Sequence, residues 1–98
     1  TGTVADDQGD LVGKNDPYKQ TYFVLKKIET VLKQAGANLS DVVRTRIFVT
    51  NIDQWEEIGS AHREVFADIK PATTMVEISR FIGPDYLVEI EATAILQE

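Results

Sequence analysis

The C-terminal stretch, residues 71–96, constrains the fold more than any other part of the chain. It consists of two runs, separated by a turn at residues 83–85, in which apolar and polar side chains alternate. Alternation with a period of two is typical of β-strands that bury one face. We expect the buried faces to carry Thr74, Val76 and Ile78 on the first strand and Val88, Ile90, Ala92 and Ala94 on the second.

The opposite faces of these two strands carry carboxylates. Glu77 lies on the first strand with Thr73 and Met75, and Glu89 and Glu91 lie on the second with Thr93. Covering carboxylates with apolar groups alone is costly. This face must therefore meet water, basic residues, a ligand or another subunit.

A helix is predicted over residues 17–35. Asp16 can act as its N-cap, Pro17 suits the first helical position, and Gly36 suits the residue just past the end. Apolar residues at helical spacing define the side that we expect to be buried: Thr21, Val24, Leu25, Ile28, Val31, Leu32 and Ala35.

A strand is predicted over residues 42–50 by its β-branched residues and its alternation. One face would carry Val43, Thr45, Ile47 and Val49, and the other Arg44, Arg46 and Phe48.

A second helix is predicted over residues 54–67, where Asp53 and Glu56 fit a capping box. We expect it to bury Trp55, Ile58, His62, Val65 and Phe66. Residues 1–5 are expected to form a short strand, followed by a turn at residues 6–10.

The order of elements is therefore strand, helix, strand, helix, strand, strand, which predicts a single α+β domain. Both helices should cover one face of the sheet, because each has an apolar side to bury. The other face would then carry Arg44 and Arg46 beside Glu77, Glu89 and Glu91. Opposite charges can pair across strands, and this face suits a subunit interface.

Composition excludes several classes of function. The net charge of −6 argues against a nucleic-acid partner, because phosphate binding needs a concentrated basic surface. The chain has no cysteine and one histidine, so thiolate nucleophiles, zinc–sulfur sites and sites of several histidines are excluded. No run has the length and apolar character of a membrane span or a signal peptide, and we expect a cytoplasmic protein without a membrane partner.

Two motifs resemble the reactive-intermediate deaminase family, also called Rid or YjgF-like. The Pro-Ala-x-x-x-Val-Glu run from Pro71, followed by Val-Glu-Ile-Glu-Ala from Val88, is similar to the family's C-terminal signature. The segment from Ala35 to Val49 is similar to its central helix-to-strand passage. The resemblance covers most of residues 20–95.

The resemblance implies a chorismate-mutase-like subunit with a mixed sheet and two helices packed on one face. It also implies a homotrimer with a small-molecule ligand in the clefts between subunits, and hydrolysis of imines and enamines to ketones and ammonia without a metal or cofactor. Family members carry an N-terminal hairpin before the position of Thr1. We therefore expect residues 1–98 to be a single Rid-like domain that lacks this hairpin.

The expected site departs from the family pattern. Imine-hydrolysing members carry, at the position of Thr73, an arginine that binds the substrate carboxylate, and a threonine cannot supply that charged two-pronged donor. The family's catalytic-side glutamate matches Glu89, a candidate acid or base. An asparagine that lines the family's cleft aligns with Gly59. We expect the cleft to lie at the start of the strand led by residues 72–74, near Glu89 of the adjacent strand.

Four further residues are candidates for substrate binding: Thr73 and Thr74 through their hydroxyl groups, and Arg44 or Arg46 as a replacement anchor. Each also has a structural interpretation. Threonine favours strands, and the arginines can form cross-strand ion pairs, including one with Glu89. The lone imidazole, His62, is either a packed residue of the second helix or a proton shuttle.

Three functions remain open at this point. The first is a deaminase or hydrolase acting on small imine or enamine metabolites. The second is a non-catalytic trimer that binds a small molecule or has a regulatory role. The third, chorismate mutase, shares the general fold, but the sequence shows no arginine cluster suited to a dicarboxylate.

Overall fold

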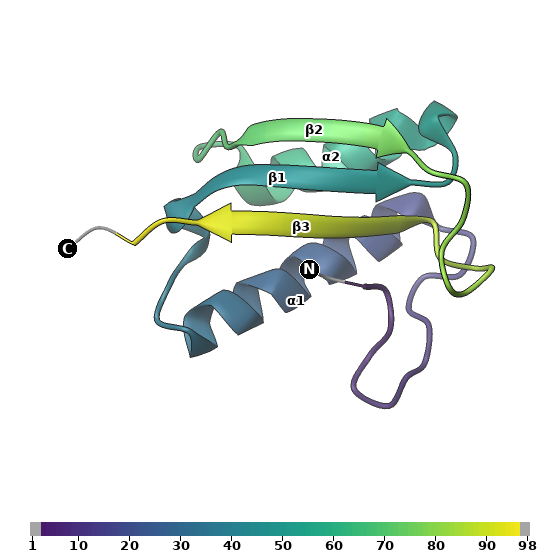
Figure 1. Ribbon diagram of the computed structural model, residues 1–98, viewed down its shortest axis with the longest axis horizontal. Coiled ribbons are helices and arrows are strands. Elements are labelled where there is room, and N and C mark those ends of the chain that lie inside the picture. The colour runs from purple at the N-terminus through teal and green to yellow at the C-terminus, as the bar shows by residue number, and fades with distance from the viewer. Residues whose placement is uncertain (1–2, 97–98) are drawn as a thin grey trace.

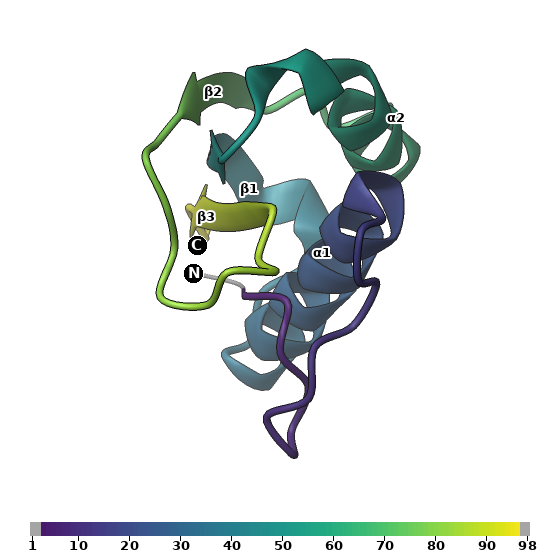
Figure 2. The ribbon, with the colours of Figure 1, turned by 90° about the vertical axis from the view of Figure 1, so that its right-hand side faces the viewer.

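Both helices pack on the same face of a mixed three-stranded sheet (Figures 1 and 2). The computed structural model describes residues 3–96. The elements in chain order are α1 (Pro17–Gln34), β1 (Val42–Val49), α2 (Trp55–Phe66), β2 (Ala72–Glu77) and β3 (Val88–Ala94). Short 3-10 turns at Leu39–Asp41 and Ile52–Gln54 precede β1 and α2. The expected α+β fold, with two helices on one face, is confirmed.

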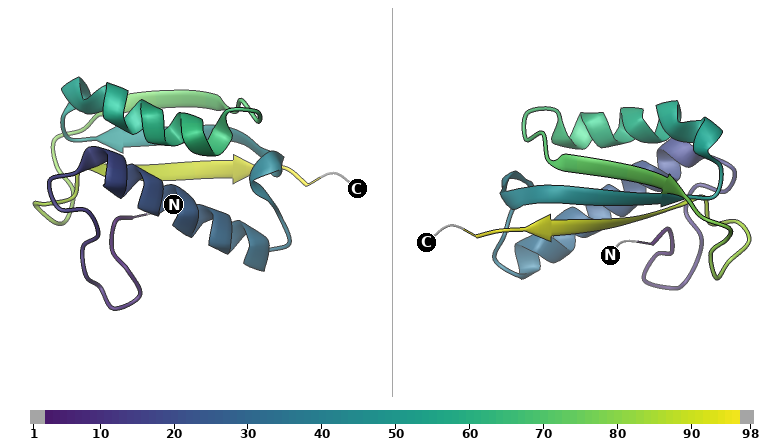
Figure 3. Two further views of the ribbon diagram at one scale, coloured as in Figure 1. Left: turned by 180° about the vertical axis from the view of Figure 1, so that it is seen from behind. Right: turned by 45° about the horizontal axis from the view of Figure 1, so that its top comes forward.

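The strand order is β2-β1-β3, with β1 parallel to β2 and antiparallel to β3. The two C-terminal runs are therefore not neighbours, and the expectation that Glu89 lies on the strand adjacent to Thr73 is wrong. Helix α2 connects the parallel strands β1 and β2, and the segment after β2 passes around the end of β1 to reach its far side (Figures 1 and 3). Alternation along a strand predicts its two faces but not its neighbours.

The faces of β2 are the reverse of the expectation. Residues paired across two strands share a face, and Thr73 pairs with Thr45 while Met75 pairs with the buried Ile47. Thr73, Met75 and Glu77 thus lie on the helix-covered side, and Thr74 and Val76 lie on the open side. At this sheet edge all residues of β2 except the half-buried Met75 are exposed, so alternation alone could not tell which side meets the core.

A β-bulge changes the start of β1. Its register with β3 shifts between Val42 and Arg44, so that Val42 is buried and Val43 is 44% exposed. Val43 was expected on the buried face. One extra residue in a strand moves the side chains on one side of it to the other face, and no sequence pattern marked this insertion.

The predicted ends of the helices agree with the structure better than their predicted buried sides do. The Asp16 carboxylate accepts a hydrogen bond from the backbone N–H of Lys19 (2.9 Å), and Gly36 adopts a φ of +86° just past α1. Val31 and Trp55, however, are 57% and 56% exposed. Both lie toward the end of a helix, and periodicity predicts the side a residue faces but not whether the core extends beneath it.

The start of α2 also differs from the prediction. No side chain caps the helix at Gln54. Instead, the side-chain oxygen of Asn51 accepts a hydrogen bond from the backbone N–H of Asp53 (3.0 Å) and starts the preceding 3-10 turn. The expected capping box of Asp53 and Glu56 is therefore wrong, because the turn separates Asp53 from the helix.

The N-terminal segment folds over α1. Thr1 and Gly2, part of the predicted strand, lie outside the described residues. From residue 3 onward the segment forms one isolated bridge, Ala5 to Leu11, around the expected turn, and the predicted strand is not part of the described sheet. The Lys27 ammonium group donates a hydrogen bond to the backbone oxygen of Ala5 (2.7 Å), and Val4 is fully buried.

Candidate functional site

A pocket of about 300 Å³ lies between the second half of α2 and the start of β2. Its volume falls at the lower end of the range for small-molecule sites. The lining residues come from the helix, the connecting turn and the strand: Gly59, His62, Arg63, Phe66, Ala67, Lys70, Pro71 and Thr73.

A chain of hydrogen bonds runs from this pocket into the core. His62 Nε2 lies 2.9 Å from the Thr45 hydroxyl oxygen, which lies 3.1 Å from the Thr73 hydroxyl oxygen. The Thr73 hydroxyl donates in turn to the backbone oxygen of Pro71 (3.1 Å). A hydroxyl has one proton, so all three bonds form together only if Thr45 donates to Thr73 and His62 donates from Nε2 to Thr45.

This series of hydrogen bonds determines what Thr73 can offer a ligand. While its only hydroxyl proton is directed to Pro71, the Thr73 side chain offers a ligand an acceptor and not a donor. The hydrogen bond from His62 to Thr45 also supports the interpretation of His62 as a packed residue. Its ring lies 4.8 Å from the Phe66 ring, and burial lowers the pKa of the imidazole below its usual 6.5, which favours the neutral form at pH 7.

The pocket is rich in cations although the protein is acidic. Arg63 and Lys70 line it, and none of the lining residues is acidic, while the whole chain has a net charge of −6. Within residues 3–96 neither cation forms a salt bridge. Lys70 adopts a φ of +53°, a conformation that costs an L-residue about 1–2 kcal/mol.

The open face of the sheet, turned toward the viewer in Figure 1, holds the other candidates. Arg46 forms an ion pair with Glu91 (2.9 Å) and lies beside Thr74 in the register. Arg44, at the start of β1, is exposed, and Glu89 lies opposite Phe48 and is half-buried. Glu77 is absent from this face, because its carboxylate points to the helix side and accepts the backbone N–H of Ile52 (3.0 Å).

The structure therefore divides the predicted site residues into two groups. Thr73 and Gly59 line the pocket on the helix side. Thr74, Arg44, Arg46 and Glu89 lie on the open face, and β1 separates Glu89 from β2. A single subunit does not bring Thr73 and Glu89 together.

Sequence reasoning missed three residues of the pocket and its hydrogen-bond chain: Arg63, Lys70 and Thr45. Thr45 was expected in the core but not as a partner of His62. Arg63 is one of several charged residues on the outer side of α2. The one available signal for Lys70 was its position directly before the Pro71 motif.

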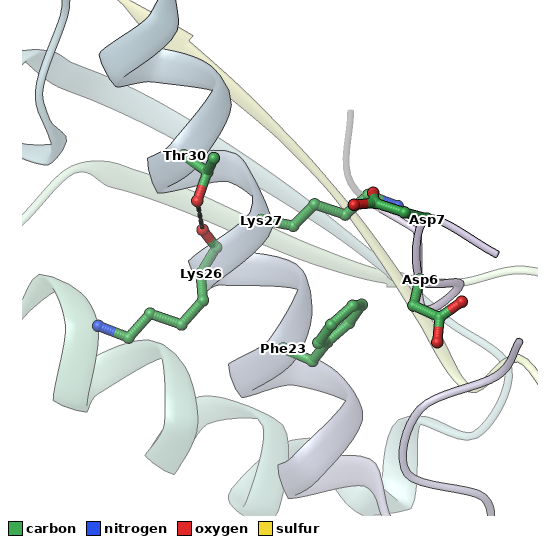
Figure 4. A pocket seen from close by; sticks show the side chains of 6 residues that line it. All are labelled: Asp6, Asp7, Phe23, Lys26, Lys27 and Thr30. Carbon is green, nitrogen blue, oxygen red and sulfur yellow. Dashed lines mark hydrogen bonds between the residues drawn. The ribbon is translucent and has the colours of Figure 1, made fainter. Parts of the chain in front are cut away.

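A second pocket, of about 290 Å³, lies between α1 and the N-terminal turn (Figure 4). The side chains of Phe23 and Lys27 extend from α1 toward the turn that carries Asp6 and Asp7, whereas Lys26 extends away from it. The Lys27 ammonium group donates hydrogen bonds to the backbone oxygens of Thr3 and Ala5, just before the turn. We interpret its role as structural, because it holds the N-terminal segment on α1.

Residues 3–96 contain neither a cluster of metal ligands nor a membrane-spanning helix. No three histidine, cysteine, aspartate or glutamate residues in this part of the chain are grouped so that they could hold a metal ion. None of the helices described there is both long and apolar enough to span a membrane.

The chain is similar to proteins of one family along nearly all of its length. The family model described as Endoribonuclease L-PSP matches residues 1–96. A RutC family protein of Pyrococcus abyssi is 36% identical over 86 residues, which are 88% of this chain and 66% of that protein. The chain thus spans about two thirds of the length of this relative.

Solved structures agree with this similarity. A member of the YjgF/YER057c/UK114 family from Mycobacterium tuberculosis has 46% sequence identity and a TM-score of 0.86, over 98% of this chain and 75% of that one. A protein of the conserved Rid family from Yersinia pestis has 40% identity and a TM-score of 0.87, with the same coverage of 98% and 75%.

Proposed function

This chain belongs to the Endoribonuclease L-PSP family, which includes the Rid and YjgF proteins, and we propose that it is a homotrimer that hydrolyses small imine or enamine metabolites. In this proposal the reaction takes place in clefts between subunits. The pocket around Thr73 belongs to one subunit, and Glu89 comes from another. The products are a ketone and ammonia, and no metal or cofactor takes part.

The state of Glu89 carries this proposal. A purely structural role predicted an ion pair between Glu89 and Arg44 or Arg46, but Arg46 pairs with Glu91 instead. Glu89 forms no salt bridge within residues 3–96, and its half-buried carboxylate lies on the open face of the sheet. A carboxylate with no charged partner in its own subunit is available to a ligand or to a second subunit.

The chemistry needs one group that accepts and returns a proton. The Glu89 carboxylate takes a proton from a water molecule as the water oxygen bonds to the imine carbon, and it returns this proton to the nitrogen, which gives a carbinolamine. Glu89 then takes the hydroxyl proton of the carbinolamine and passes it to the nitrogen, so that the C–N bond breaks as the C=O bond forms and the nitrogen leaves as ammonia. Overall, an imine and water give a ketone and ammonia.

The open face of the sheet supports assembly with further copies. Val76 is 41% exposed there, paired with Phe48 in the register and next to the Arg46–Glu91 pair, and Val43 at the bulge is 44% exposed. Apolar residues among paired charges suit an interface between subunits better than open solvent. In a cyclic trimer this surface would bring Glu89 of one copy toward the pocket of the next.

A second candidate is a non-catalytic trimer that binds a small molecule. The observation that favours it is the Thr73 hydroxyl, whose proton is directed to Pro71 rather than to a ligand. We propose the cytoplasm as the location for either function. We do not propose binding to RNA, because the net charge of −6 opposes association with a polyanion that carries many phosphates.

An assay of imine hydrolysis distinguishes the two candidates. An amino-acid oxidase generates the imine, and the release of keto acid and ammonia is followed with and without the protein. We expect acceleration by the wild type and a loss of at least about a hundredfold in Glu89→Gln, because general acid–base catalysis contributes roughly 10²–10⁴-fold. Glu91→Gln is the matched control on the same strand and should keep most of the activity. A wild-type rate equal to the uncatalysed rate would favour the non-catalytic binder.

A further inference from the structure

We propose that Arg63 and Lys70 form an anion-binding site in the pocket between α2 and β2, and that the ligand carries a carboxylate or phosphate group. The inference rests on the proposed function in that it assigns a ligand class to the same pocket. It assigns the binding of the anion to the end of α2 and the turn after it, not to the strands.

Elimination among the donors leads to these two residues. Thr73 has no free hydroxyl proton, and Thr74 lies on the other face of the sheet. Arg46 is engaged by Glu91, and Arg44 lies with it on the open face. Arg63 and Lys70 are the charged residues that line the pocket, and neither forms a salt bridge within the described chain.

The backbone at Lys70 is a separate indication of function. Its φ of +53° is a conformation in which glycine is not strained and lysine is. The N–H groups of Ile69 and Lys70 both bond to the backbone oxygen of Phe66 (3.0 Å each), so the turn has a fixed shape. Strained residues of this kind cluster at binding and catalytic sites.

The surroundings leave room for a ligand beside these cations. Gly59 lines the pocket, and a Cβ atom added to it would meet no atom within 4 Å. Phe66 lines the pocket without any hydrogen-bonding group in its side chain. A guanidinium fork, an ammonium group and an apolar surface together suit a small organic anion.

The test measures binding without turnover, so that it stands or fails separately from the hydrolysis assay. Pyruvate and inorganic phosphate are titrated into the protein at low ionic strength, where charge interactions are least screened. Binding is followed by the amide NMR signals of Gly59, Ala67 and Thr73. We expect saturable shifts with at least one anion, and the anion that binds identifies the group as carboxylate or phosphate.

Two variants and a control assign the site. Arg63→Gln and Lys70→Gly should each weaken binding by roughly tenfold or more, the size expected for one charge-assisted hydrogen bond. Lys70→Gly should weaken binding while its melting temperature stays equal to or above that of the wild type, because glycine relieves the strain of the positive φ. Lys14→Gln removes one charge outside the pocket and should leave affinity within about twofold. Absence of saturable binding in the wild type, or affinity unchanged in both pocket variants, would overturn the proposal.

Discussion

Among single residues, His62 couples the pocket to the core through a hydrogen bond to the buried Thr45. Burial lowers the pKa of His62 in the folded protein below the 6.5 of the unfolded chain. The unfolded state therefore binds more protons than the folded state as the pH falls through 6.5. The free energy of unfolding should fall over this window and level off below the folded pKa.

This dependence can be measured by urea denaturation at several pH values between about 5.5 and 7.5, above the range in which unperturbed carboxylates titrate. His62 is the only histidine in the chain, so the slope is assignable to it. His62→Gln should flatten the dependence. An equal slope in the variant would mean that another group is responsible.

The sequence identified the candidate residues better than it identified their partners. Thr73, Thr74, Arg46 and Glu89 all lie on the strands where they were expected. Whether Arg46 pairs with Glu89 or Glu91 depends on a strand register that includes the bulge at Val43, and no local pattern predicted it. The positive φ of Lys70 was equally hidden, because glycine or asparagine would normally mark such a turn.

Among the elements, α1 holds the crossover between β2 and β3 through the fully buried Gln20. Its side-chain nitrogen donates to the backbone oxygens of Gly13 (3.1 Å) and Asp85 (3.0 Å), and its oxygen accepts the N–H of Leu87 (2.9 Å). These bonds position the start of β3 and thereby Glu89.

Removing these bonds should be costly. Gln20→Leu leaves up to three backbone groups without partners, and we expect a loss of about 2–5 kcal/mol in the free energy of unfolding. Gln34→Leu, at the exposed end of α1, is the control and should change it by less than about 0.5 kcal/mol. Urea denaturation measures both. A loss below 1 kcal/mol in Gln20→Leu would show that water or a shifted loop replaces the side chain.

The arrangement of elements was predictable where one layer determines another. Apolar periodicity placed both helices on one face, because each has one side to bury. The position of β3, on the other side of β1 from β2, was not predictable from the sequence. The alternation in residues 72–77 and 88–94 is the same whether the two strands form a hairpin or are joined by a crossover. Gln20 was part of a helix whose predicted buried side contained only apolar residues and threonine, and its contacts with Asp85 and Leu87 lie more than sixty positions away in the sequence.

For the whole molecule, the central question is whether the site is complete in one copy. The pocket with Thr73, Arg63 and Lys70 lies on the helix side of the sheet, and Glu89 lies on the open face beyond β1. In our account the copies form a closed ring in which each pocket faces Glu89 of the next subunit. Such a heterologous interface makes every site the product of two chains.

Mixed assemblies test this claim most directly. Glu89→Gln and the double variant Arg63→Gln/Lys70→Gly are unfolded together, refolded as an equal mixture and assayed for imine hydrolysis, with the mass followed by light scattering. Random assembly into closed trimers should restore about a quarter of wild-type activity, because one site in four combines an intact pocket with an intact Glu89. Activity no higher than that of either parent, in mixtures that have the mass of a trimer, would contradict the account, as would a mass that remains at the 10.9 kDa of a single chain.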